Sequence, residues 1–73
     1  MQILIIGAGR IGRSVAEALV DEDNDITLVD TDSERIEEMQ DRLDLRGIVG
    51  NATSPDVLRQ AGADDADMII AVT

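Results

Sequence analysis

Three glycines at the spacing G-x-G-x-x-G directly follow an apolar run near the start of the chain. The run is QILIIG, residues 2–7, and the glycines occupy GAGRIG, residues 7–12. A short continuous apolar run is typical of a strand that is buried on both faces. Ile11, Val15 and Leu19 lie four residues apart, which predicts one apolar stripe of a helix. A glycine loop between a strand and a helix indicates a parallel α/β fold.

Apolar strands and amphipathic helices alternate over the rest of the chain. Strands are expected at 26–30, at 45–50 and at 66–73, the last of them also buried. Ile36, Met39 and Leu43 share one face of a second helix, and Thr31 and Glu34 before them have the spacing of a capping box. A third helix has its expected N-cap, first residue and C-terminal cap at Ser54, Pro55 and Gly62.

The order of elements is therefore β-α-β-α-β-α-β over one domain, residues 1–73. Strands that alternate with helices predict a Rossmann-like parallel sheet with right-handed crossovers. The expected strand order is 3-2-1-4, with the first two helices on one face of the sheet and the third helix on the other. A complete Rossmann domain is longer, so we expect a truncated one.

The composition argues against several kinds of site. The chain has no cysteine, histidine or lysine, and its formal net charge is −10. Serine and threonine therefore have no side-chain base to activate them, and we do not expect an enzyme. A strongly acidic surface repels nucleic acid and anionic lipids. No apolar run approaches the ~20 residues that cross a bilayer, so direct membrane insertion is not expected either.

An acidic residue ends the second expected strand, where a dinucleotide-binding fold needs one. Asp30 follows Gly12 by 18 residues, close to the ~20 residues that are typical. Gly7 would allow a tight turn, Gly9 would let a pyrophosphate approach the backbone, and Gly12 would let the helix pack closely on the strand. Asp30 would accept hydrogen bonds from ribose hydroxyls and repel a 2′-phosphate. The expected cofactor is NAD(H) rather than NADP(H), with ATP or ADP as alternatives.

Further ligand contacts are expected from the loops that follow the strands. Residues 51–53 would lie on the adenine side and Thr73 on the nicotinamide side, although the loop at 50–54 could equally be a plain helix cap. Arg10 would lie either over the diphosphate or in solvent. The full expected set is Gly7, Ala8, Gly9, Arg10, Ile11, Gly12, Asp30, Thr31, Asn51, Ala52, Thr53 and Thr73.

Four stretches resemble the Trk-type potassium-uptake regulators of the RCK, or KTN, family. They are NDITLVD, MQDRLDLR, GNATSPDVLRQAGADDADM and IIAVT. The resemblance implies a regulatory module that binds NAD(H) or an adenine nucleotide and couples ligand state to gating. It also implies a cytoplasmic location, at the inner face of the membrane through a membrane-embedded potassium transporter. Members of the family form rings of dimers, and an apolar sheet face left under-covered here also predicts a homodimer or larger assembly.

Two alternative functions remain open at this point. The chain contains no aromatic residue, which fits an engineered or reconstructed minimal Rossmann fragment that binds a nucleotide, or a fold fragment alone. The chain also fits the cofactor half of an NAD-dependent dehydrogenase whose catalytic residues lie elsewhere.

Overall fold

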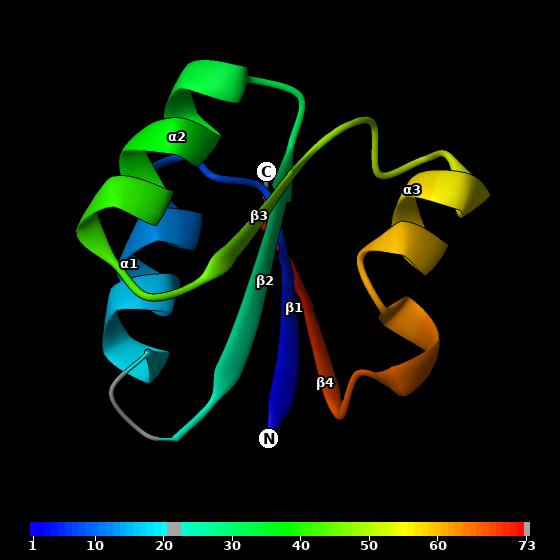
Figure 1. Cartoon of the computed structure of the whole chain (residues 1–73), viewed down its shortest axis with the longest axis horizontal. Coiled ribbons are helices and arrows are strands. Elements are labelled where there is room, and N and C mark those ends of the chain that lie inside the picture. The colour runs from blue at the N-terminus through cyan, green and yellow to red at the C-terminus, as the bar shows by residue number, and fades with distance from the viewer. Residues whose placement is uncertain (21–22, 73) are drawn as a thin grey trace.

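The computed structural model describes residues 1–20 and 23–72 as strands alternating with helices (Figure 1). The elements in chain order are β1 (Gln2–Ile6), α1 (Arg10–Leu19), β2 (Asp25–Asp30), α2 (Ser33–Arg42), β3 (Arg46–Val49), α3 (Pro55–Gln60), the 3₁₀ turn η1 (Ala63–Asp65) and β4 (Met68–Ala71). Each strand begins and ends within two residues of the sequence-based expectation, and Thr73, which the fourth expected strand included, lies outside the described residues.

All four strands run parallel, in the order β3-β2-β1-β4. The predicted Rossmann-like topology is confirmed. β1 lies in the interior of the sheet, because Ile3 pairs with Ile26 of β2 on one side and with Met68 of β4 on the other. A strand with neighbours on both edges and helices on both faces is buried over most of its length, here at Ile3, Leu4 and Ile5, which explains the apolar run at the start of the sequence.

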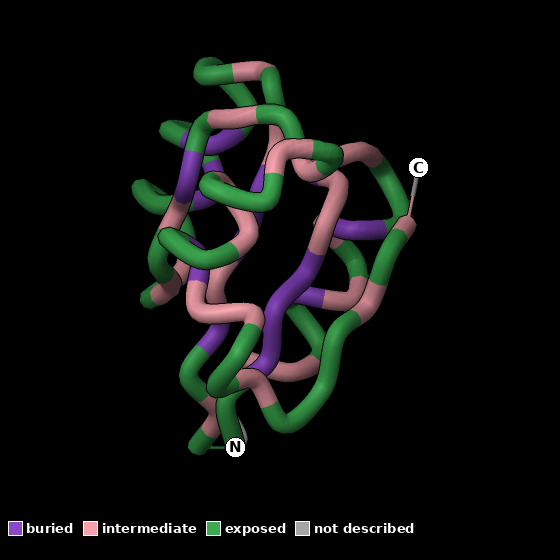
Figure 2. The backbone as a smooth tube through the Cα atoms, turned by 90° about the vertical axis from the view of Figure 1, so that its right-hand side faces the viewer, coloured by how far each residue is buried: buried purple, intermediate pink, exposed green. Residues whose placement is uncertain are grey.

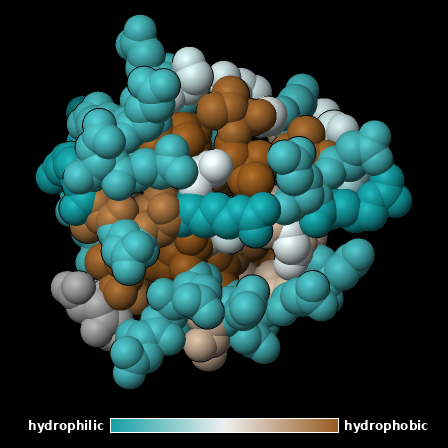
Figure 3. Space-filling view, viewed as in Figure 1, coloured by the Kyte–Doolittle hydropathy of each residue, from teal (hydrophilic) through white to brown (hydrophobic). Residues whose placement is uncertain are grey.

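The helices cover the two faces of the sheet as expected, with α1 and α2 on one side and α3 on the other (Figure 1). Two clusters of buried side chains follow from this. One lies under α1 and α2 and contains Ile5, Leu28 and Met39, and the other lies under α3 and contains Leu4 and Val29. In the tube view the buried positions follow the strands and the inner helix faces (Figure 2). Apolar surface remains visible between the two helical layers (Figure 3).

Two sequence-based expectations about apolar residues are wrong. β4 is an edge strand and not a buried one, so Met68 and Ile69 are 43% and 51% exposed. Ile11 is 61% exposed although Val15 and Leu19 of the same stripe pack against the core. Ile11 is the second residue of α1, where the helix has only just left the carboxyl edge of the sheet.

The N-terminus of α2 is capped differently from the prediction. Asp32 is the N-cap, and its Oδ1 atom accepts hydrogen bonds from the backbone N–H groups of Glu34 at 3.0 Å and Arg35 at 3.4 Å. The expected capping box between Thr31 and Glu34 is therefore wrong by one residue. Asp is as good an N-cap as Ser or Thr. The sequence pattern alone therefore does not determine which of two adjacent residues is the N-cap.

Replacing this cap gives a stability prediction. Asp32→Ala is expected to lower the free energy of unfolding by about 0.5–2 kcal/mol, because two N–H groups at the start of α2 lose their acceptor. Thr31→Ala serves as the control and should change stability by less. Urea unfolding followed by far-UV circular dichroism measures both, and a larger loss for Thr31→Ala would contradict the assignment of the cap.

Candidate nucleotide-binding site

The glycine loop leaves β1 in a conformation that needs glycine at two positions. Gly7 has φ +110°, and a Cβ built on it would lie 1.7 Å from the carbonyl oxygen of Val72. A Cβ on Gly12 would lie 1.8 Å from the carbonyl oxygen of Gly7. Gly7 therefore makes the tight turn and Gly12 allows close packing of α1 on the loop, as the sequence predicts. Gly9 has open space around the position of a Cβ.

Two hydrogen bonds tie this loop to the end of β2. The backbone N–H of Gly7 donates to the carbonyl oxygen of Val29 at 2.8 Å. The backbone N–H of Ala8 donates to Oδ2 of Asp30 at 2.6 Å, while Oδ1 of Asp30 accepts from the N–H of Asp32 at 2.9 Å. The carboxylate of Asp30 is thus fixed beside the loop, and each oxygen keeps a further lone pair for another donor.

The same contacts determine the ionisation of Asp30. Burial alone would raise the pKa of this carboxyl, but the hydrogen bonds from the backbone N–H groups of Ala8 and Asp32 outweigh that effect. The positive charge of Arg35 acts in the same direction, and the pKa of Asp30 lies below its ordinary value. Asp30 is therefore an anion at neutral pH and can only accept hydrogen bonds.

Two adjoining cavities open at this edge of the sheet, and together we call them the glycine-loop crevice. The first has a volume of about 200 Å³ and is lined by Ile6, Gly7, Val29, Asp30, Thr31, Gly50, Ala52 and Val72. The second has a volume of about 410 Å³ and is lined by Gly9, Arg10, Ile11, Gly12 and Val72. Val72 lines both. The carboxyl ends of parallel strands, where this crevice lies, are the usual place for a ligand in an open α/β sheet.

Most of the residues expected at the site come together there. Eight of the twelve line the crevice: Gly7, Asp30, Thr31, Ala52, Gly9, Arg10, Ile11 and Gly12. Ala8 is buried beneath the loop and contributes its N–H group to Asp30. Thr73 lies outside the described residues. Sequence reasoning missed Ile6, Val29, Gly50 and Val72, because nothing in an apolar residue or a strand-end glycine distinguishes a cavity wall from ordinary packing.

Asn51 and Thr53 do not line the crevice. Instead, Oδ1 of Asn51 accepts hydrogen bonds from the backbone N–H of Thr53 at 2.9 Å and from its hydroxyl at 2.8 Å. This local turn leads into α3, whose N-cap is Ser54 and whose first residue is Pro55. These contacts support the simpler of the two interpretations of residues 50–54, a turn and helix cap, for Asn51 and Thr53, whereas Ala52 lies in the crevice.

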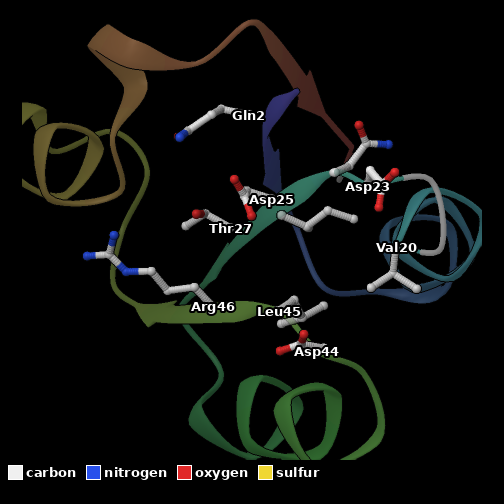
Figure 4. Close-up of a pocket in the computed structure, with 10 residues that line it drawn as sticks. Gln2, Val20, Asp23, Asp25, Thr27, Asp44, Leu45 and Arg46 are labelled. Atoms are coloured by element: carbon white, nitrogen blue, oxygen red, sulfur yellow. The ribbon is translucent and has the colours of Figure 1, made fainter.

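A larger cavity, about 720 Å³, lies at the opposite edge of the sheet and is unsuited to phosphates (Figure 4). It is lined by residues at the starts of β1, β2 and β3 and by the loops before them, among them Asp23, Asp25 and Asp44. Carboxylates repel an anionic ligand, and only Arg46 brings a positive charge to this wall. Size alone therefore does not identify the site.

No helix in residues 1–20 and 23–72 is long and apolar enough to span a bilayer. Within the same residues, no group of three or more acidic side chains is placed to hold a metal ion.

The parallel sheet in the order 3-2-1-4, with a glycine loop after β1 and an acid at the end of β2, defines a Rossmann-like α/β domain. Comparison with known protein families narrows the class. The sequence matches the TrkA-N domain over residues 3–73, and the chain belongs to this family.

Curated relatives extend over much more than this domain. The chain is 56% identical over all 73 residues to the Trk system potassium uptake protein TrkA of Vibrio alginolyticus, and 55% identical to that of Haemophilus influenzae. A TrkA homolog of Archaeoglobus fulgidus is 40% identical over the same length. The chain spans 16% of the length of each of these relatives.

Solved structures confirm the fold. The TrkA-N domain of the inner membrane protein YbaL from Escherichia coli superposes with a TM-score of 0.88 at 27% identity, over 96% of this chain and 51% of that one. The Kef C-terminal domain of Shewanella denitrificans in an AMP-bound form has a TM-score of 0.79 at 26% identity, over 94% of this chain and 40% of that one. A short-chain dehydrogenase/reductase from Saccharomyces cerevisiae, 24% identical over 99% of this chain and 33% of that one, has a TM-score of 0.81 and shows the fold alone.

Proposed function

We propose that this domain binds NAD(H), or in its place ATP or ADP, in the glycine-loop crevice. The observation that carries the proposal is the fixed carboxylate of Asp30 in the same cavity as Gly7. A nucleotide whose ribose hydroxyls donate to Asp30 would have its phosphates beside Gly9 and the start of α1. The helix dipole and the free N–H groups of the first turn favour anions there.

Features of α1 support a phosphate at this end. Gly9 is the N-cap and offers no side chain to the first turn, and that turn contains no acidic residue. The N–H groups at the start of the helix therefore have no competing carboxylate of their own. The AMP-bound state of the Kef domain supports an adenine nucleotide as the ligand class for a domain of this shape.

The regulatory role is a second part of the proposal. The curated relatives are potassium uptake proteins of the Trk system, so we propose that the domain works at the cytoplasmic face of a membrane-embedded potassium transporter. Its ligand would shift the population of one arrangement of the assembly, which the transporter senses as a change in gating. No residue of the chain is assigned a catalytic role.

Calorimetric titration with NADH, NADPH and ATP tests the binding proposal. We expect saturable binding of NADH, and weaker binding of NADPH because its 2′-phosphate would meet the carboxylate of Asp30. Far-UV circular dichroism of the same sample establishes that the protein is folded. A folded sample that binds none of the three nucleotides would contradict the proposal.

Self-association is the remaining part of the proposal. β4 exposes Met68 and Ile69 at an edge of the sheet, and apolar surface of this kind favours contact with a second copy. We expect a homodimer or larger assembly. Size-exclusion chromatography with multi-angle light scattering measures the mass directly, and a monomer at all concentrations would contradict it.

A further inference from the structure

A fourth cavity lies between α1 and α2 and gathers most of the positive charge of the protein. It has a volume of about 420 Å³, and Arg10, Arg13, Arg35 and Arg42 line it together with Ala8, Gly9, Ser14 and Glu17. These four arginines, which define what we call the arginine cavity, are four of the six basic residues in a chain of net charge −10. This cluster of positive charge therefore has the opposite sign to the net charge of the protein.

The neighbouring carboxylates do not form a close ion pair with every arginine of this cluster. Arg13 is 2.9 Å from Glu38, while Arg42 is 3.5 Å from Glu17 and 3.8 Å from the same Glu38. Arg35 is 3.5 Å from Asp32. Within residues 1–20 and 23–72, Arg10 has no carboxylate within salt-bridge distance. Three carboxylates within salt-bridge distance therefore face four guanidinium groups, and Asp30 acts on Arg35 from farther away.

Several of these pairs are also weak enough to exchange for another anion. The distances of 3.5 and 3.8 Å are longer than a charge-assisted hydrogen bond of about 2.7–2.9 Å. The side chains of Arg35 and Arg42 are about half exposed, and exposed ion pairs contribute little to stability. An incoming dianion could take over their guanidinium groups at small cost to the fold.

We propose that the arginine cavity is a second anion site, which takes a phosphate-class dianion. Guanidinium groups offer paired N–H donors in a plane, a geometry that matches phosphate oxygens. The first turn of α1 adds to the same field, because Arg10 and Gly9 line this cavity and the glycine-loop crevice alike. This site is separate from the binding of a nucleotide in the crevice and does not depend on it.

Such a dianion has two possible sources, a free phosphate or a phosphate on the ribose of a bound nucleotide. The cavity is next to the ribose position, because Ala8 lines it and donates its N–H to Asp30. The carboxylate of Asp30 would repel a ribose phosphate, however, and this favours the free anion as the source. A bound phosphate would then adjoin the nucleotide without being part of it.

Titration of the whole chain with inorganic phosphate tests the proposal. Sodium chloride keeps the ionic strength constant, and two-dimensional amide NMR follows the response. We expect saturable shifts of the Ala8, Gly9 and Ser14 amides. Arg10→Gln and Arg42→Gln should each weaken phosphate binding by about 2- to 5-fold, the upper part of the range for one exposed charge pair. Arg59→Gln removes the same charge from α3, outside the cavity, and should leave the affinity unchanged.

The outcomes separate this proposal from the proposed function. Shifts that never saturate, or equal effects of Arg42→Gln and Arg59→Gln, would overturn the anion site. NADH binding without any phosphate response would also overturn the anion site and leave the nucleotide proposal standing. A phosphate response without NADH binding would support the anion site and contradict the nucleotide proposal. If the site exists, competition by NADPH but not by NADH identifies the ribose phosphate as the source, and simultaneous binding of NADH and phosphate identifies the free anion.

Discussion

Gly12→Ala is expected to lower the free energy of unfolding by about 3 kcal/mol or more, because no side chain fits between α1 and the glycine loop. The added Cβ would lie 1.8 Å from the carbonyl oxygen of Gly7 and 3.2 Å from a methyl group of Val72. The first contact involves backbone that cannot rotate away. α1 would have to move off the sheet, and the contacts of Val15 and Ala16 with the core would weaken.

This loss is a large part of the total stability, which for 73 residues is about 4–11 kcal/mol. Urea unfolding followed by far-UV circular dichroism is the suitable measurement, because the chain has no aromatic residue to report by fluorescence. Gly9→Ala is the matched control. Nothing lies within 4 Å of its Cβ position, so it should cost less than about 1 kcal/mol, the difference between two N-cap residues. Equal losses for the two variants would refute the close-packing role of Gly12.

Asp30→Ala is expected to weaken NADH binding by about 5- to 150-fold, which corresponds to about 1–3 kcal/mol. The reason is the loss of a charged acceptor for the ribose hydroxyls. Asp30 also holds the N–H of Ala8, so the variant additionally releases the loop. Asp64→Ala removes the same charge from η1, outside the four cavities described above, and is the control for charge alone.

The comparison of NADH with NADPH separates the two effects of Asp30→Ala. A released loop would weaken both ligands alike. Loss of the ribose contact would weaken NADH more, and removal of the carboxylate would relieve the repulsion of the 2′-phosphate in NADPH. The ratio of the affinity for NADH to the affinity for NADPH should therefore be smaller in Asp30→Ala than in the wild type. An unchanged NADH affinity in a folded variant would exclude Asp30 from the site.

Asp30 also makes stability depend on pH in a defined direction. Its pKa is lowered in the folded protein, so the carboxylate contributes stability above the ordinary unfolded value of about 3.9 and loses it as the pH falls through the lower folded value. The difference in unfolding free energy between the wild type and Asp30→Asn should thus be constant near neutral pH and shrink below about pH 4.

The spacing of apolar residues and the positions of glycine and proline predicted the fold from the sequence, because both are local features. An apolar strand, a glycine turn and a helix stripe each depend on neighbouring residues, and the right-handed crossover rule then left few topologies. The exposure of Met68 and Ile69 was not predictable in this way, since a continuous apolar run looks the same in an edge strand and in a central one.

The candidate site was predictable only where one residue type has a special property. Glycine and aspartate at fixed spacing identified Gly7, Gly12 and Asp30. The arginine cavity was not foreseen, because Arg10 and Arg42 are 32 residues apart in sequence and meet only when α1 and α2 pack side by side. The role of Asn51 was ambiguous in the sequence, because one amide side chain suits a ligand contact and a local turn before a helix equally well.

The position of β1 between β2 and β4 has a consequence for how the protein is made. Among the four strands described, β1 is made first, but one of its edges is completed by the one made last, Met68–Ala71. Gln2 is joined to Asp67 across 65 residues by a backbone-to-carboxylate hydrogen bond. Synthesis therefore leaves one edge of β1 open until Met68–Ala71 have been made, and during that interval a chaperone, or the β1 edge of another nascent chain, competes with β4 for it.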